Sequence, residues 1–80
     1  MARFEYGSPA ELFNNPGNGR RRGQLGYRRF ESGAEAVRFA IEEMPQALLP
    51  SVILESQEQR YDHSAIRMLY ASDEYPLDRR

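Results

Sequence analysis

A strand is predicted where side chains alternate between Gln24 and Phe30. The odd-numbered residues of Leu25–Arg29 share one side of an extended segment, and the even-numbered residues of Gly26–Phe30 share the other. Apolar residues are concentrated after this segment. Residues 34–80 hold eleven Val, Ile, Leu and Phe residues, whereas residues 1–33 hold five of them and all six glycines. The core is therefore expected mainly in the second part of the chain.

A helical period follows the strand. Ser32 and Glu35 form a capping box, and the positive end of the helix dipole favours Glu35. Because Pro45 disfavours helical geometry at the preceding residue, the helix is predicted to end at Met44. At about 100° per residue the apolar side chains form one core-facing stripe of Val37, Ala40, Ile41 and Met44, with Gly33 and Ala34 at its upper end.

Phe39 lies on the charged side of this helix. Its neighbours on that side are Glu35, Arg38, Glu42 and Glu43. Two interpretations are open: a single exposed aromatic, which is common on protein surfaces, or the centre of a contact surface. Phe39 is therefore a candidate protein-interaction residue.

A short hairpin and a second helix are predicted next. Ser51–Glu55 is rich in strand-forming residues, and Gln59–Tyr61 returns antiparallel across a turn at Ser56 to Glu58. Asp62 then caps a helix that ends near Ser72. A longer helix from Glu55 to Tyr70 is the alternative, because no Asn-Gly or Asp-Gly pair marks the turn.

The order of these elements predicts an α+β fold. It is a small β-α-β-β-α unit with a three-stranded mixed sheet and two helices on one face, spanning residues 24–76, with a C-terminal tail at 77–80. The first connection is a right-handed crossover that can hold parallel neighbours. One face of such a sheet lacks cover, so self-association that buries it is expected.

Residues 1–23 are predicted to form a flexible arm rich in Gly, Asn and Arg. The run from Asn14 to Gly19 contains only turn residues. Ser8-Pro9-Ala10-Glu11 is a capping box with proline at the first helical position, which predicts a short helix near residues 9–13.

Composition narrows the class of protein. With 80 residues there is room for one domain with a small core. The chain has no cysteine, which removes disulfide scaffolds, thiolate zinc sites and cysteine nucleophiles. No apolar run approaches the roughly 20 residues of a membrane helix, and no signal-peptide core follows Met1. A soluble cytoplasmic protein without membrane contact is therefore predicted.

Charge is balanced overall but divided along the chain. Eleven basic residues, all arginine, meet twelve acidic residues, giving a net charge of −1. Six Arg and three Glu before Ala34 give +3, and five Arg and nine acidic residues after it give −4. Charge-driven binding must therefore be local.

Candidate chemistry for catalysis or for metal and cofactor binding is sparse. His63 is the only histidine, and its neighbours Asp62 and Ser64 cannot converge on it as a catalytic triad must. One histidine and no cysteine leave no metal-ligand cluster. The run from Gly17 to Gly23 lacks the ending of a phosphate-binding loop and follows no predicted strand. We therefore predict no enzyme, no metal and no cofactor.

An arginine cluster is the clearest candidate binding feature. It has aromatic residues nearby, as a site that grips phosphates and stacks bases requires. The alternatives are a solvated arm that keeps the protein soluble and a contact with an acidic protein surface. The candidate contacts are Arg20, Arg21, Arg22, Tyr27, Arg28 and Arg29.

Three segments resemble small uncharacterised bacterial proteins, chiefly alphaproteobacterial ones. They are Tyr27–Ser32, Ala34–Ala40 and the stretch from Tyr61-Asp62 to Ile66–Tyr70, within a likeness over roughly residues 26–76. The resemblance implies a bacterial cytoplasmic domain with residues 1–25 outside its common part. It carries over no functional residue.

These features predict a small non-enzymatic interaction or accessory domain. Its partner would be a second copy or another protein. Weak nucleic-acid binding through the arginine-rich segment 20–29 is the alternative function.

Overall fold

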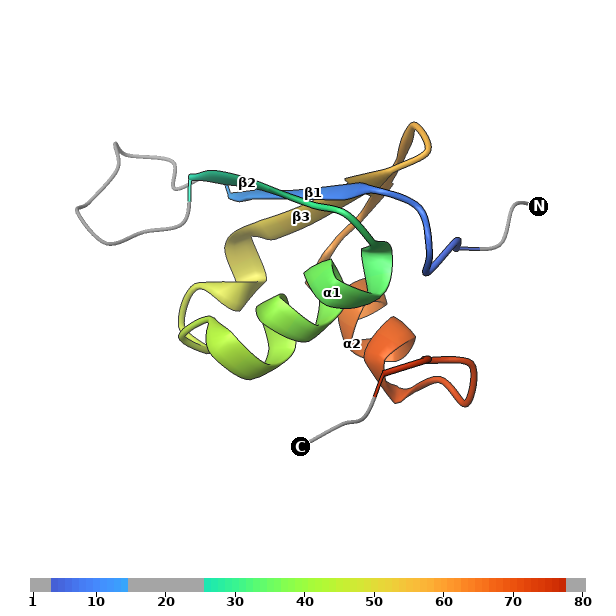
Figure 1. Cartoon of the computed structure of the whole chain (residues 1–80). Helices are drawn as coiled ribbons and strands as arrows, with labels where there is room; N and C mark the ends of the chain where they lie inside the picture. Colours follow the sequence, from blue (N-terminus) through green and yellow to red (C-terminus); the bar gives the residue numbers. More distant parts are fainter. Residues whose placement is uncertain (1–3, 15–25, 78–80) are drawn as a thin grey trace.

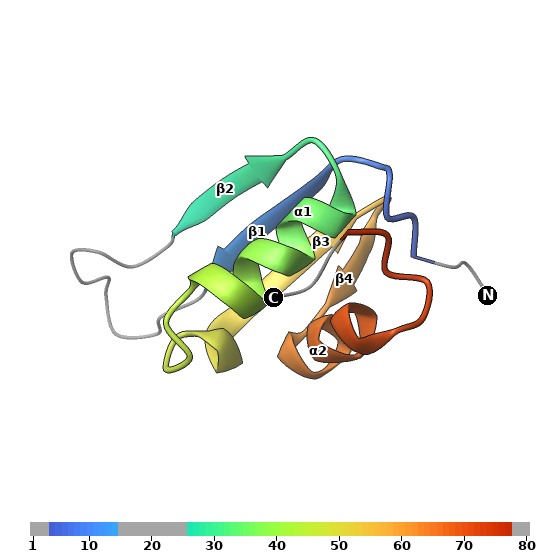
Figure 2. The same ribbon diagram turned by 60° about the horizontal axis from the view of Figure 1, so that its bottom comes forward.

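A computed structural model describes residues 4–14 and 26–77 as one sheet with helices packed on one face (Figure 1). The four strands run antiparallel to their neighbours in the order β2-β1-β3-β4. Figure 2 shows α1 and α2 in front of the sheet. The strands are β1 (Ala10–Asn14), β2 (Tyr27–Phe30), β3 (Val52–Ser56) and β4 (Gln59–Tyr61), and the helices are α1 (Gly33–Arg38), continued by a π-helical turn (Phe39–Glu43), a 3-10 turn (Leu49–Ser51) and α2 (His63–Ala71).

The predicted α+β class is confirmed, but the sheet differs from the prediction. It has four strands and is wholly antiparallel, whereas a three-stranded mixed sheet was expected. β2 and β3 both run antiparallel to β1, so they point the same way. They are not neighbours, because β1 lies between them.

The additional strand is β1, where the capping box predicts a short helix near residues 9–13. Ala10, Leu12 and Asn14 are buried, whereas Glu11 and Phe13 are half-buried on the opposite face. β1 pairs with β2 on one side and β3 on the other. These two ladders outweigh a capping signal that acts only over four residues. Residues 4–14 are thus part of the folded domain, and the predicted arm residues 15–23 lie outside the described residues.

Both predicted helix caps are confirmed. The Ser32 hydroxyl accepts from the backbone N–H of Glu35 at 3.2 Å, and the Asp62 carboxylate accepts from that of Ala65 at 2.9 Å. The first helix becomes a π-helical turn at Phe39 and gives way to extended backbone at Met44, with ψ at 147°. This ending agrees with the restriction that Pro45 places on Met44.

The predicted hairpin is also confirmed, which excludes the longer helix. β3 and β4 pair with Ser56 opposite Gln59, so Gln57 and Glu58 form a two-residue turn. Both turn residues have positive φ, 55° and 65°, as in the turns that suit the twist of a hairpin.

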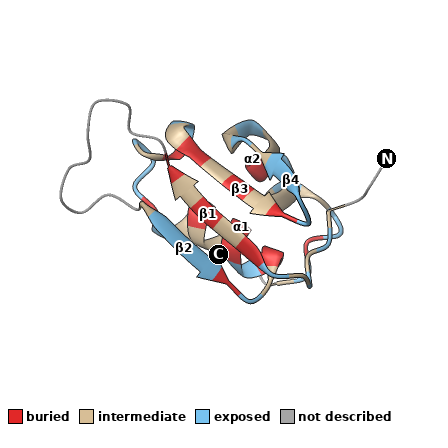
Figure 3. Ribbon diagram, turned by 90° about the horizontal axis from the view of Figure 1, so that it is seen from above, coloured by how far each residue is buried: buried red, intermediate tan, exposed pale blue. Residues whose placement is uncertain are grey.

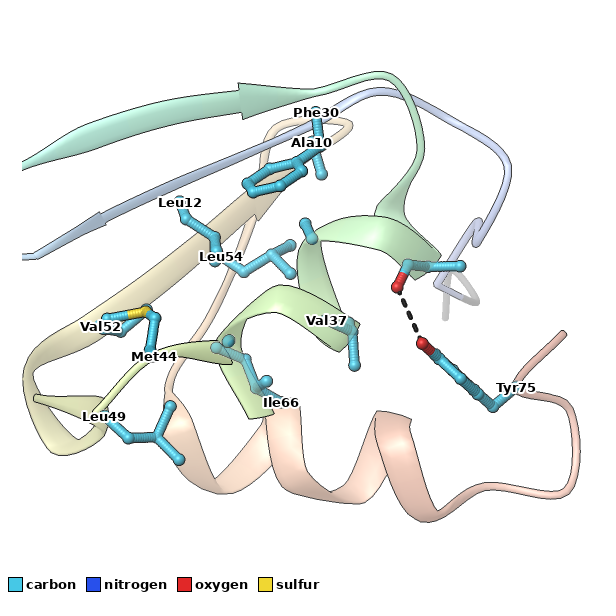
Figure 4. Close-up of a cluster of buried hydrophobic side chains, with 13 residues drawn as sticks. Ala10, Leu12, Phe30, Val37, Met44, Leu49, Val52, Leu54, Ile66 and Tyr75 are labelled. Atoms are coloured by element: carbon cyan, nitrogen blue, oxygen red, sulfur yellow. Dashed lines mark hydrogen bonds between the residues drawn. The ribbon is translucent and has the colours of Figure 1, made fainter. Parts of the chain in front are cut away.

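The core lies between the sheet and the helices. Leu12, Leu54 and Ile66 have no exposed surface and come from β1, β3 and α2 (Figure 4). The Tyr75 hydroxyl donates to the carbonyl of Ala34 at 3.1 Å and joins the C-terminal segment to α1. The core comprises Ala10, Leu12, Phe30, Ala34, Ala36, Val37, Ala40, Met44, Leu49, Val52, Leu54, Ile66 and Tyr75.

The N-terminal segment is held to this core by side chains. The Tyr6 hydroxyl donates to the carbonyl of Leu69 at 2.8 Å. Phe4 packs edge-on against Tyr61, with ring centroids 5.1 Å apart. Ser56 donates to the carbonyl of Pro9 at 2.9 Å and ties the β3–β4 hairpin to the start of β1.

Candidate functional site

One face of the sheet has no helix over it in the part of the chain that the structure describes. Figure 3 looks directly onto this face. Strand register places its side chains in two rows that run across the strands. We call this surface the uncovered face, and its rows are Tyr27–Phe13–Ile53 and Arg29–Glu11–Glu55–Arg60.

The first row is apolar. Phe13 and Ile53 lie opposite each other on the two central strands, and both are half-buried. Tyr27 is 60% exposed on the edge strand. The Arg60 guanidinium lies 5.8 Å from the centre of the Phe13 ring, close enough for a cation–π contact.

The second row carries two positive and two negative charges. The Tyr27 hydroxyl donates to Glu11 Oε2 at 2.8 Å, and an Arg29 nitrogen lies 3.9 Å from the same oxygen. This hydrogen bond to a carboxylate raises the pKa of Tyr27 above its ordinary value near 10.0. The charges of the row are thus balanced within one chain.

A second surface lies between β2 and the first helix, at the edge of β2 that pairs with no strand among the described residues and is here called its free edge. It is a hollow of about 280 Å³, here called the β2 hollow. The Arg28 guanidinium lies 5.0 Å from the centre of the Phe30 ring and 4.8 Å from that of Phe39. The residues lining the hollow are Arg28, Phe30, Glu35, Arg38, Phe39, Glu43 and Leu77.

The charges around the β2 hollow are only partly paired. Arg38 lies 3.4 Å from the Glu42 carboxylate, whose side chain is 7% exposed and also accepts a hydrogen bond from the Tyr70 hydroxyl. Between described residues the ion pairs are Arg38–Glu42 and Arg29–Glu11, and Arg28 belongs to neither. Arg28 is therefore held by aromatic rings and not by a carboxylate.

The predicted arginine cluster does not form one surface. Arg20, Arg21 and Arg22 lie outside the described residues. Tyr27 and Arg29 point to the uncovered face, whereas Arg28 points to the helical side of the sheet. The period of two along β2 separates these side chains, although they are adjacent in sequence.

Phe39 lies beside Arg28, a neighbour that the sequence did not connect with it. It is half-buried, and its ring centre lies 5.4 Å from that of Phe30. It is therefore not a lone exposed aromatic. The edge strand extends over this flank of the helix and covers part of its charged side.

The sequence also missed most of the uncovered face. The sequence places Glu11 and Phe13 in the predicted arm, and it predicts no binding role for Ile53, Glu55 and Arg60. Residues 10–14 carry no clear strand signal, because apolar and polar residues do not alternate along Ala-Glu-Leu-Phe-Asn. Their alternation of buried and half-buried positions arises only in the folded sheet.

The remaining candidate group is His63, at the start of α2. It is half-buried, and its Nδ1 atom is buried without a hydrogen-bond partner. The described residues contain no group of three or more His, Cys, Asp or Glu that could hold a metal ion. Among those residues no helix has the length and apolar character to cross a membrane.

The resemblance to bacterial proteins stays a prediction. Comparison of this chain with protein-family models, with curated proteins and with solved structures found no match.

Proposed function

We propose that this chain is a small non-enzymatic interaction domain that associates with a second copy through the uncovered face. The observation that carries the proposal is the position of Phe13 and Ile53. They lie side by side at the centre of a sheet face that no described helix covers. Sheets whose faces carry apolar side chains pack against another layer.

Charge supports a second copy as the partner. Arg29 and Arg60 balance Glu11 and Glu55, so two such faces can approach without opposing net charges. A two-fold dimer is also the commonest assembly of a small soluble domain. It would add an apolar layer to a thin core.

The size of the face predicts weak association. Four strands about 4.8 Å apart, with lengths of 5, 4, 5 and 3 residues, cover roughly 270 Å². Stable interfaces bury about 800 Å² on each partner. We therefore expect a weak dimer that exchanges rapidly, with a Kd of about 10 μM to 1 mM.

Sedimentation equilibrium over that concentration range tests the proposal. The mass should rise from 9.3 kDa towards twice that value. Phe13→Thr and Ile53→Thr should each keep the mass at the monomer value, because they remove the apolar row. Met68→Thr is the matched control, since Met68 is 74% exposed on α2, outside the uncovered face. A monomer mass for the unaltered chain at every concentration would contradict the proposal.

Nucleic-acid binding remains the second candidate function. Arg28 supports it, because this guanidinium has no carboxylate partner in the ion pairs between described residues and lies over two aromatic rings. The pairing of Arg29 with Glu11 opposes it, because the Glu11 carboxylate, 3.9 Å away, competes with a phosphate for that cation.

A further inference from the structure

The free edge of β2 carries a second inference, independent of self-association. β2 is the outermost strand of the sheet, and Tyr27, Arg28 and Arg29 are all exposed. Figure 3 shows this strand along one border of the sheet, and Figure 2 shows α1 beside it on the helical side. An exposed strand edge is a template for one more strand.

The backbone of β2 presents hydrogen-bonding groups at this edge. The Asn14 N–H donates to the carbonyl of Gly26 at 3.2 Å, so that pair belongs to the hydrogen-bonded set of the β1–β2 ladder. Hydrogen-bonded and non-bonded pairs alternate along an antiparallel ladder. The N–H and C=O groups of Tyr27 and Arg29 therefore point away from β1, towards the free edge.

The β2 hollow lies where side chains of an added strand would be placed. Alternate residues of such a strand point to the helical side of the sheet. There they meet Phe30, Phe39 and Leu77. At about 280 Å³ the hollow is smaller than the roughly 300–1,000 Å³ of small-molecule sites, which suits one or two side chains.

Arg28 favours a negative charge on one of the side chains that an added strand would place in the β2 hollow. Its guanidinium lies over the Phe30 and Phe39 rings and belongs to neither ion pair between described residues, so its N–H groups can donate to a carboxylate. Glu35 and Glu43 also line the hollow and disfavour a second acidic side chain. The complementary strand therefore carries one acidic residue and, two positions away, an apolar residue.

A second copy of β2 fits this edge poorly. Antiparallel pairing of two β2 strands would bring the Arg28-Arg29 pair of one copy against the same pair of the other. Like charges directly opposite each other destabilise a strand pair. Arginines at a sheet edge are a known protection against such pairing.

We propose that the β2 edge and the β2 hollow bind an extended segment of a partner protein as a fifth strand. The segment has an acidic and an apolar residue at positions i and i+2. The acidic side chain pairs with Arg28, and the apolar one contacts Phe39 and Leu77. Backbone hydrogen bonds to Tyr27 and Arg29 supply affinity, and the two side chains supply specificity.

The test uses two capped hexapeptides and the full chain. The Glu peptide has the sequence Thr-Glu-Thr-Leu-Thr-Thr, and the Lys peptide has Lys in place of Glu. In ¹H–¹⁵N NMR titrations the Glu peptide should shift the amides of Tyr27 and Arg29 and bind about tenfold more tightly than the Lys peptide. Arg28→Glu should reverse this preference, and Arg28→Gln should abolish it. Phe13→Thr should leave it unchanged, which separates this site from self-association.

Three results would overturn the proposal. One is an absence of shifts in β2 up to millimolar peptide. Another is equal affinity of the unaltered chain for the two peptides. The third is a spectrum in which the shifts are confined to Phe13, Ile53 and their neighbours on the uncovered face. Should Arg28→Glu fail to fold, Arg28→Gln alone decides whether Arg28 sets the preference.

Discussion

At the scale of single residues, both helices begin with a side-chain cap. Ser32 and Asp62 cap their helices through hydrogen bonds to residues three positions ahead. Such bonds depend on the local chain path and need no tertiary contact. They are therefore present in the sequence pattern itself.

The candidate binding residues were less predictable for a physical reason. The sequence groups Tyr27, Arg28 and Arg29 as one cluster because they are adjacent. In a strand, adjacent side chains face opposite sides of the sheet. The partners that complete each surface, Glu11 and Phe39, come from other elements. Sequence proximity therefore could not define the site.

The β3–β4 turn carries a residue-scale prediction. Glu58 has φ at 65°, a conformation that costs a residue with a Cβ about 1–2 kcal/mol and glycine almost nothing. We expect Glu58→Gly to raise the free energy of unfolding by about 0.5–1 kcal/mol, after the entropy that glycine gains in the unfolded chain. Urea denaturation measures the change.

A glycine substitution at a helical position tests whether relief of the positive φ causes the stabilisation expected for Glu58→Gly. Arg67 is exposed within α2, where backbone angles are helical. Arg67→Gly should lower stability by about 1 kcal/mol. If Glu58→Gly were equally destabilising, strain in the turn would not be its dominant effect.

At the scale of elements, the helices and the hairpin were predictable and β1 was not. The hairpin and both helices form through contacts between residues that are close in sequence. β1 instead pairs with residues 27–30 across an intervening segment and with residues 52–55 across the whole α1 region. Sequence signals at Ser8–Glu11 describe only the local preference, which these long-range ladders override.

Because β1 lies at the centre of the sheet, we expect its buried side chains to be important for the stability of the fold. Leu12 has no exposed surface, so Leu12→Ala should lower the free energy of unfolding by about 2–5 kcal/mol. For a chain of this size that is a large share of the whole stability, about 4–12 kcal/mol. Chemical denaturation followed by circular dichroism measures it.

The control lies on the same strand. Phe13 is only half-buried on the uncovered face, so Phe13→Thr should cost about 1 kcal/mol or less at concentrations where the chain is monomeric. A silent Leu12→Ala substitution would mean that residues 9–13 act as an arm after all, and that β1 contributes nothing to the fold.

At the scale of the whole molecule, charge distinguishes the two candidate functions. A chain with net charge −1 has no global attraction for nucleic acid, and Glu11 holds Arg29 on the uncovered face. Five phosphate contacts by Arg20, Arg21, Arg22, Arg28 and Arg29 would give a log affinity against log salt slope near −4.5 on duplex DNA. Without Arg29 the slope falls to about −3.6.

We expect no salt-sensitive binding of a short mixed-sequence oligonucleotide by the full chain. Fluorescence anisotropy at low and moderate salt measures this. The expectation would be contradicted by binding whose log affinity falls with log salt at a slope near −3.6. Loss of that binding when Arg20, Arg21 and Arg22 are changed to Gln would support nucleic-acid binding. Arg67→Gln, an exposed arginine on α2, serves as the control for a general loss of charge.

The sequence by itself determined what depends on local geometry: the two capped helices, the end of the first helix before Pro45, the β3–β4 hairpin and the α+β class. Tertiary structure alone decided the fourth strand, the order β2-β1-β3-β4 and the faces on which Phe13, Arg28 and Phe39 lie. The physical reason is that caps and turns are closed by neighbours in sequence. Strand ladders and both candidate surfaces join residues far apart, whose pairing depends on the buried area of the whole core.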